Sequence, residues 1–322
     1  MRIAVFQSGL GRDGPGLLLR DILRREEDVL AARDVIAAAR PDILLLLRFD
    51  WDHDGQALAG FAALLSEAGH PMPYHFAPRP NTGWATGLDM DGDGRTGTPD
   101  DAQGWGRFSG AGGMALLARL PIMAEAAQDH STFLWRDLPG ALIPMRDGAP
   151  FPSAAVFDVQ RLSSAGHWQV PLRLPDGSAL HVLAWHAGPP AFGGPMQRNR
   201  RRNHDETAFW ALFLDGVLPF PPPAPPFVLI GNSNLDPEAG DGIQGAMQAL
   251  LGHPALQDPR PMGPHPQTGT PGVATAYWPR GPGALRVSYI LPDAGQDVLD
   301  AGLIWPETGS HALVWLDLAL PR

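Results

Sequence analysis

The sequence predicts an α/β fold, and two observations point to it. Short apolar runs of the kind that form buried strands alternate along the chain with longer segments that have helical periodicity. Of the 322 residues, 44% are hydrophobic, which is enough for a substantial core. The length allows either one large domain or two small ones.

Strands are expected where short runs are apolar or rich in β-branched residues. In chain order these runs are residues 3–6, 43–47, 114–117, 179–185, 227–230, 285–291 and 313–318. Each is short enough for a sheet strand and too short for a typical globular helix.

Helices are expected between these strands. Apolar side chains recur with helical spacing over residues 17–39 and 56–68. A third helix over residues 207–214 follows Asn203 and Glu206, which have the spacing of a capping box. The sequence therefore predicts strands and helices in alternation, as in an α/β domain.

Glycine and proline mark the connections. The third helix should end at Gly216, and the proline-rich residues 219–226 predict a stiff, extended connector into the next strand. Residues 70–112 and 253–283 are rich in glycine and proline and have little periodicity. We expect both segments to form long loops at one rim of the domain.

Composition excludes several classes of protein. All 24 basic residues are arginine, so lysine-dependent phosphate loops and Schiff bases are excluded, and the absence of cysteine excludes disulfides and thiol chemistry. The net charge of −10 opposes nonspecific binding to nucleic acid. No stretch is long and apolar enough to span a membrane, and the N-terminus lacks a signal-peptide pattern, which favours a cytoplasmic location.

Three short motifs near the C-terminal end are the most informative feature of the chain. They are Gly231-Asn232-Ser233-Asn234, Arg286-Val287-Ser288-Tyr289 and Gly309-Ser310-His311. They resemble motifs of the endonuclease/exonuclease/phosphatase superfamily, which read Gly-Asp-x-Asn, Arg-x-Asp-Tyr and Ser-Asp-His. The resemblance implies a single deoxyribonuclease I-like domain over residues 1–322, a four-layer sandwich of two packed mixed β-sheets flanked by helices.

Other segments match the same superfamily in the same order. The first predicted strand ends at Gln7, where the family has asparagine, and the second ends near Arg48, where the family has its metal-binding glutamate. Further matching segments are residues 81–83, 87–106, 112–115, 162–168, 186–190 and 198–206. Their order and spacing resemble the bacterial branch of the superfamily.

The resemblance implies an active site that has lost its carboxylates. The family hydrolyses phosphoesters with a divalent ion, water-positioning polar residues and a histidine supported by a carboxylate. The matching positions here hold Arg48, Asn232, Ser288 and Ser310, a change of five charges in the positive direction, two of them at Arg48. Because Mg²⁺ and Mn²⁺ need hard oxygen ligands, usually with a carboxylate among them, we expect no catalytic Mg²⁺ or Mn²⁺.

The resemblance also implies a vestigial phosphate cleft at His186, Asn234 and His311. Ser288 cannot give His311 an ionised partner, and a histidine at a strand end is also common as a purely structural residue. The basic residues 198–202 form either a solvated turn or the rim of an anion pocket. The candidate ligand-binding residues are His167, Arg198, Arg201, Arg202 and Asn203.

An acidic segment elsewhere resembles a calcium-binding loop. Its candidate ligands are Asp89, Asp91, Asp93, Arg95, Asp100 and Asp101, with Gly94 at the turn. The twelfth position is Asp100, and its side chain is shorter than the usual glutamate. The segment predicts a structural Ca²⁺ site that pins a long loop, and the alternative is a solvated acidic turn.

Three classes of function remain open from the sequence. The first is a catalytically inactive family member whose cleft binds an anionic or phosphorylated small molecule, or a protein partner. The second is a metal-dependent phosphoesterase that recruits other carboxylates, such as Asp50, Asp52 or Asp236. The third is a structural or interaction protein, suggested by ten tryptophans and the glycine- and proline-rich loops.

Overall fold

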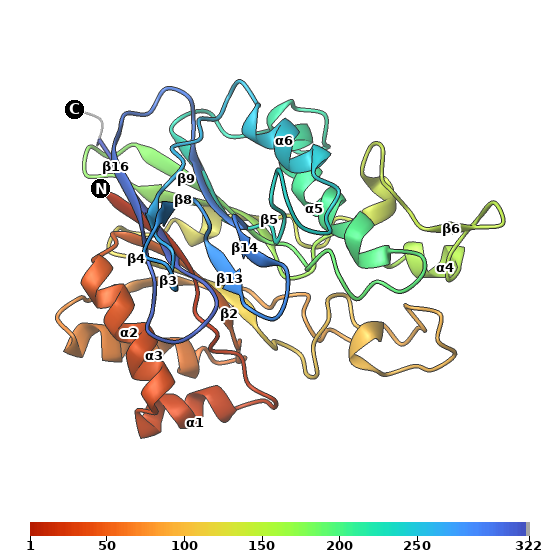
Figure 1. Ribbon diagram of the computed structural model, residues 1–322, viewed down its shortest axis with the longest axis horizontal. Helices are drawn as coiled ribbons and strands as arrows, with labels where there is room; N and C mark the ends of the chain where they lie inside the picture. The colour runs from red at the N-terminus through yellow and green to blue at the C-terminus, as the bar shows by residue number, and fades with distance from the viewer. Residues whose placement is uncertain (320–322) are drawn as a thin grey trace.

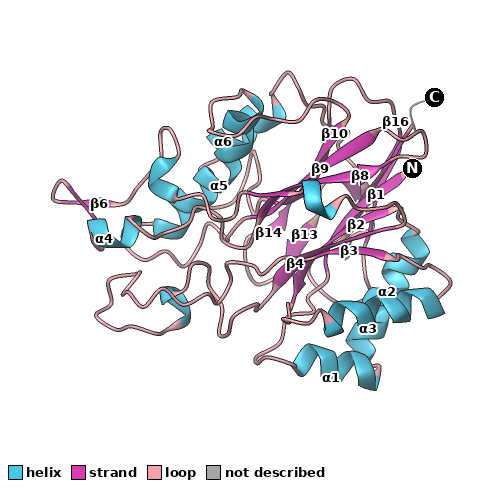
Figure 2. Cartoon of the chain, turned by 180° about the vertical axis from the view of Figure 1, so that it is seen from behind, coloured by secondary structure: helices cyan, strands magenta, loops and turns pink. Residues whose placement is uncertain are grey.

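In a computed structural model, which describes residues 1–319, two β-sheets lie face to face at the centre of the molecule. Helices cover the outer face of each sheet, with α1, α2 and α3 on one side and α5 and α6 on the other (Figures 1 and 2). The layers therefore run helix, sheet, sheet, helix. This arrangement confirms the predicted α/β sandwich.

The first sheet has six strands. Their order is β16 (Val298–Ile304), β17 (Leu313–Leu318), β1 (Arg2–Gln7), β2 (Ile43–Phe49), β4 (Gly113–Ala118) and β3 (Tyr74–Phe76). Strands β1 and β2 pair in parallel, and the other pairs are antiparallel. Its outer face packs against α1 (Leu17–Arg24), α2 (Glu27–Ala39) and α3 (Gln56–Glu67).

The second sheet has five strands. Their order is β15 (Ser288–Pro292), β10 (Phe227–Asn232), β9 (Ala179–His186), β8 (His167–Arg173) and β5 (Gln128–Asp129). Strands β9 and β10 are parallel, so this sheet is also mixed. Its outer face packs against α5 (Arg198–Leu214) and α6 (Gly245–Leu251).

Short elements lie in the connections. They are η1 (Pro99–Asp101), η2 (Ala124–Ala126), η3 (Trp135–Asp137), α4 (Ala154–Phe157), β6 (Met145–Arg146), β7 (Ala149–Pro150), β11 (Gly263–Pro264), β12 (Pro271–Gly272), β13 (Ala276–Trp278) and β14 (Gly283–Leu285). The long loop between β3 and β4, orange to yellow in Figure 1, extends from the sheets at the same end of the molecule as α4 and β6. Every helix among the described residues is too short or too polar to cross a lipid bilayer.

The alternation of side chains along each strand builds three apolar layers. In β1, Ile3 and Val5 pack between the two sheets, whereas Ala4 and Phe6 pack against the helices. Both faces of the central strands are thus buried, which explains why their sequences are continuous apolar runs and not alternating ones.

Two predicted elements are divided in the structure. The helix expected over residues 17–39 is α1 and α2, because Arg25 adopts φ 58° at the end of α1 and its N–H closes on Ile22 O. The strand expected over residues 285–291 is β14 and β15, which belong to different sheets.

The third predicted helix is longer than expected. It begins at Arg198 and ends at Leu214, with Gly216 in the left-handed region just beyond, so its end was predicted correctly and its start was wrong. Asn203 lies inside α5 and is not its N-cap. Its side-chain N–H₂ donates to the backbone oxygens of Gly188 and Ser233, which ties α5 to the ends of β9 and β10.

Candidate functional site

A cleft of about 670 Å³ opens where the ends of β1, β2 and β9 meet. Its remaining walls come from parts of residues 82–112, 164–165, 187–206 and 306–311, together with Asn234 and Trp278. The two segments predicted to be long loops at one rim, residues 70–112 and 253–283, both contribute to these walls. The sheet registers explain the convergence, because Asn232 pairs with His186 of β9 on one side and with Ser288 of β15 on the other.

The structure brings most of the candidate cleft residues together. Those that line the cleft are Gln7, Arg48, His186, Asn234, Ser310 and His311. Asn232 lies directly behind them and contacts Gln7, and Ser288 is buried next to Asn232 across the sheet.

A chain of amide hydrogen bonds runs through this group. Asn232 Nδ2 donates to Gln7 Oε1 at 2.7 Å, and Gln7 Nε2 lies 2.8 Å from His311 Nε2. Because Gln7 Oε1 already accepts a hydrogen bond, Gln7 Nε2 is the donor to His311. His311 therefore carries its proton on Nδ1, and its Nε2 lone pair accepts the hydrogen bond from Gln7. Asn232 Oδ1 accepts from the backbone N–H of Asn234 at 2.6 Å, which completes the chain.

Both cleft histidines are neutral at physiological pH. Burial, together with the charge of Arg48, lowers the pKa of His186 to about 3. Burial and the charge of Arg48 lower the pKa of His311 to about 4. Within the described residues, His186 Nδ1, His311 Nδ1 and Ser288 Oγ are buried without a hydrogen-bond partner. Polar atoms of this kind are uncommon in native proteins.

Arg48 occupies a β-bulge in β2. The register of β2 shifts between Leu47 and Phe49, and Arg48 adopts φ 56°, which turns its exposed side chain toward the cleft. Arg48 forms no ion pair with the carboxylate of Asp50 or Asp236. Both carboxylates accept hydrogen bonds from backbone N–H groups, and no ion pair of Arg48 occurs within residues 1–319.

Two of the basic residues from the 198–202 run also line the cleft. Arg202 is buried and donates to the backbone oxygens of residues 103, 161, 162 and 163, and burial lowers its pKa to about 10. Arg198 Nη2 donates to Gln160, whereas Arg198 Nε is inaccessible and has no acceptor among the described residues. Arg202 therefore has a structural role in holding the cleft wall, and Arg198 has an unused donor.

The other candidate ligand-binding residues lie elsewhere. His167 is buried behind the cleft, stacked on Trp210 with ring centroids 5.3 Å apart, and its Nε2 donates to the backbone oxygen of Glu206 at 3.0 Å. Arg201 donates to the backbone oxygen of Met196. Neither residue lines the cleft, nor does Asn203. Arg201 and Asn203 are on α5, whose helical rotation turns them away from the cleft, and His167 is the first residue of β8.

Sequence reasoning missed the role of Glu206. Its carboxylate is fully buried at the cleft and accepts hydrogen bonds from the backbone N–H groups of Ser164 and Gly188. Burial raises its pKa to about 7, so it is only partly ionised at neutral pH. The available signal was its spacing of four residues from Arg202, which places both on one face of a helix.

The acidic loop gathers only part of its predicted set. One carboxylate oxygen from each of Asp89, Asp91 and Asp101 lies within 4.8 Å of the others, so Asp101 and not Asp100 closes the group. The remaining predicted ligands, Asp93, Arg95 and Asp100, lie outside it. Asp89 also accepts from the backbone N–H groups of Gly92 and Gly94 at 2.7 and 2.9 Å.

The sequence of residues 9–311 matches the family model described as "Endonuclease/Exonuclease/phosphatase family". This match covers nearly the whole chain. The chain belongs to the endonuclease/exonuclease/phosphatase family.

Solved structures share the fold along the whole chain. The endonuclease/exonuclease/phosphatase from Beutenbergia cavernae DSM 12333 has a TM-score of 0.59 and 17% identity, over 99% of this chain and 71% of that chain. A family protein from Leptotrichia buccalis C-1013-b has a TM-score of 0.55 and 13% identity, over 99% and 100% of the two chains. A mannosyl-6-phosphatase from Bacteroides thetaiotaomicron VPI-5482 has a TM-score of 0.52 and 11% identity, over 99% and 100%. A search of curated proteins finds no match.

The donor set in the cleft does not fit the divalent ion that the family resemblance implies. Among the described residues, the acidic side chains that lie close enough together to share a metal ion are in the 89–101 loop and not in the cleft. The strand ends present amides, a hydroxyl and the guanidinium of Arg48. Gln7 is the amide side chain hydrogen-bonded to His311, and its oxygen already accepts from Asn232. A divalent cation at these strand ends would meet the positive charge of Arg48, and none of the strand-end residues that line the cleft carries a carboxylate.

Proposed function

We propose that this family member binds an anionic or phosphorylated small molecule in its cleft and does not hydrolyse it by metal catalysis. The observation that carries the proposal is Arg48, an exposed guanidinium that points into the cleft and has no ion pair among residues 1–319. A planar guanidinium matches the oxygen geometry of phosphate and carboxylate, to which it can donate two hydrogen bonds.

The charge balance of the cleft supports an anion. Three arginines line it, Arg48, Arg198 and Arg202, against two acidic side chains, Asp100 and Glu206. Glu206 is only partly charged at neutral pH because burial raises its pKa to about 7. The cleft is therefore net positive even though the whole chain is acidic.

The geometry gives hydrolysis little support. A general acid or base works best with a pKa near the working pH, whereas the pKa of His311 is about 4 and its Nε2 accepts from Gln7. Of the carboxylates that could rescue activity, Asp52 accepts from the N–H groups at the start of α3, and neither it, Asp50 nor Asp236 lines the cleft. Two carboxylates, Asp100 and Glu206, do line the cleft, but within residues 1–319 the His311 side chain is hydrogen-bonded to Gln7 and to neither of them.

Exposed apolar side chains give the interaction-protein alternative no comparable support. Leu23, Val217 and Leu299 are each more than half exposed, but they lie on α1, the turn after α5 and β16. Single exposed apolar residues on separate elements are normal for a protein surface.

A second proposal is that the acidic loop binds Ca²⁺ in a structural role. The support is the convergence of Asp89, Asp91 and Asp101. Three carboxylates can supply hard oxygen ligands for Ca²⁺, and the ion would offset their mutual repulsion while pinning the loop to the cleft wall that begins at Asp100.

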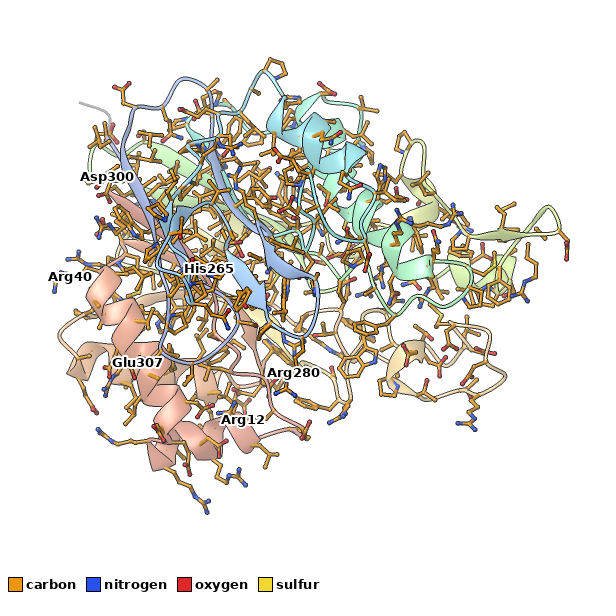
Figure 3. All side chains as sticks on the ribbon, in the orientation of Figure 1. Arg12, Arg40, His265, Arg280, Asp300 and Glu307 are labelled. Atoms are coloured by element: carbon orange, nitrogen blue, oxygen red, sulfur yellow. The ribbon has the colours of Figure 1, made fainter. Side chains whose placement is uncertain are left out.

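Calorimetric titration with inorganic phosphate in the presence of chelator tests the anion proposal. Arg48→Glu should weaken binding by about tenfold or more, since hydrogen bonds to charged groups contribute about 1.5–3 kcal/mol. Arg40→Glu is the matched control, because it makes the same charge change on an exposed residue at the end of α2, whose side chain points outward (Figure 3) and does not line the cleft. Absence of phosphate binding, or equal loss in both variants, would contradict the proposal.

A further inference from the structure

Two large aromatic side chains at the cleft are exposed to solvent. Trp105 is 52% exposed and Phe192 is 92% exposed, and both line the cleft together with Trp278. Leaving this much aromatic surface in water is unfavourable. Aromatic side chains gathered on a concave surface with a few polar groups are typical of small-molecule sites.

The backbone holds Phe192 in a fixed position. The oxygen of Ala191 accepts from Asn199 Nδ2 at 2.8 Å, and the oxygen of Gly193 accepts from the N–H of Arg198 at 3.1 Å. Gly193 lies so close to α5 that a Cβ there would be 2.5 Å from the nitrogen of Asn199. Phe192 is thus tied to the start of α5 on both sides, and its φ of 63° is enforced by these contacts.

The backbone before Trp105 is fixed in a similar way. Gly104 N donates to the oxygen of Asn81 at 3.1 Å, and its oxygen accepts from the N–H of Gly83 at 2.8 Å. A Cβ on Gly104 would lie 1.9 Å from the oxygen of Ser164, so this close approach needs glycine. Both exposed aromatic residues therefore belong to a preorganised framework.

An aromatic surface also adjoins the end of the cleft where we place the anion. The rings of Trp278 and His311 meet edge to face, with centroids 5.2 Å apart. The cleft volume of about 670 Å³ falls in the range of sites for organic ligands, roughly 300–1,000 Å³, and exceeds the needs of an inorganic anion.

We propose that the ligand is a phosphate monoester that carries a planar aromatic ring, with its phosphate at Arg48 and its ring against Trp105 and Phe192. This assignment rests on the proposed function, because it adds an organic body to the anion. Stacking on an aromatic side chain accepts any planar ring, so the shared chemistry includes nucleotides and simple aryl phosphates. A sugar phosphate has no planar face and should gain nothing from the rim.

The test is calorimetric titration, with chelator present, of inorganic phosphate, glucose 6-phosphate, phenyl phosphate and adenosine monophosphate. The two aromatic esters should bind about tenfold or more tightly than the other two probes. In the double variant Trp105→Ala, Phe192→Ala this preference should vanish while the affinity for inorganic phosphate stays unchanged. Because both side chains are exposed, the variant should keep the melting temperature of the parent.

The outcomes separate this inference from the function on which it rests. A preference for both aromatic esters supports it, and a preference for the nucleotide alone supports it and identifies the source of the ring. Equal affinity for all four probes, or a preference that survives in the double variant, overturns it while leaving anion binding intact. If phosphate does not bind, or Arg48→Glu and Arg40→Glu behave alike, both proposals fail together.

Discussion

Gln7 Nε2 lies 2.8 Å from His311 Nε2, and this contact joins the first strand of the chain to the last motif. Gln7 is the donor in this hydrogen bond, because the oxygen of its amide group accepts from Asn232 at 2.7 Å, which leaves the nitrogen facing His311. The histidine nitrogen that could face a reacting group is therefore an acceptor for a neutral amide. An arrangement of this kind holds His311 in place and gives it no partner that can take up charge.

The first prediction concerns hydrolysis. Purified protein with Mg²⁺ or Mn²⁺ should hydrolyse generic phosphomonoesters and phosphodiesters no faster than its His311→Ala variant. Losing one electrostatic stabiliser typically lowers a rate by about 10²–10³, and several positions have changed here. Metal-dependent turnover in the parent that disappears in His311→Ala would show that the cleft is catalytic.

The sequence predicted well those elements whose burial can be predicted from local apolar composition alone. Residues 43–47 are continuously apolar because both faces of β2 are covered, and the observed strand extends only to Phe49. Strands β8 and β16 were missed because their identity depends on their partners. β8 contains polar residues such as Gln169 and Arg173, and β16 contains Asp300 and Gly302, so each forms through pairing with a neighbour and not through periodicity.

The candidate site shows the same limit. The family resemblance predicted that Gln7, Asn232 and His311 share one cleft, and hydrogen bonds join the three side chains in the structure. The side-chain direction of Arg48 depends on a bulge, and bulges have no reliable local signal. The early start of α5 was also missed, since its basic first turns lack apolar periodicity and are held by tertiary contacts such as those of Arg202.

The second prediction concerns calcium. Ca²⁺ should raise the melting temperature, because a ligand that binds only the folded state stabilises it by about 2.7 kcal/mol at a hundredfold excess over its dissociation constant. The double variant Asp91→Ala, Asp101→Ala should lose this response, and Asp93→Ala should keep it because Asp93 lies outside the convergent group. Identical melting curves in Ca²⁺ and in chelator would identify the loop as an acidic turn.

The third prediction concerns acid stability. His130 is buried against Phe209, Phe213 and Phe220, with the Phe220 ring stacked 4.3 Å away, and burial lowers its pKa to about 4. The unfolded chain, with a histidine pKa near 6.5, binds more protons than the folded protein in this window. The free energy of unfolding therefore falls as the pH drops from about 6.5 toward 4.

The variant His130→Phe should reduce this acid sensitivity. Between pH 7.5 and 4.5 it should lose less stability than the parent, by a difference on the order of 2 kcal/mol, measured by denaturant unfolding at both values. His53→Phe, at an exposed position, is the control and should follow the parent. The opposing effect of Glu206, whose raised pKa favours folding at lower pH, is common to all three proteins and cancels in the comparison. Parallel losses in the parent and in His130→Phe would mean that other groups control the acid transition.

The last prediction is that a metal site can be rebuilt by restoring three carboxylates. The combined variant Arg48→Glu, Asn232→Asp, Ser310→Asp should bind Mn²⁺ at the cleft, and its melting temperature should rise with Mn²⁺ concentration. The reason is the present hydrogen-bond chain. With an acceptor at position 232, the Gln7 amide must turn to donate to it, which places the Gln7 oxygen opposite His311 Nε2 and reverses that hydrogen bond.

Electron paramagnetic resonance of Mn²⁺ counts the ions bound to this variant. Every protein in the comparison should also carry Asp91→Ala and Asp101→Ala, so that the acidic loop binds none of the Mn²⁺ that is counted. The double loop variant alone should then bind no Mn²⁺ near the cleft, and adding Arg48→Glu by itself should restore little, since one carboxylate is a weak site. If the double loop variant alone already binds Mn²⁺ and loses it with Asn234→Ala, the cleft still holds a metal without its carboxylates. The assignment of Arg48 as an anion-binding residue would then be wrong.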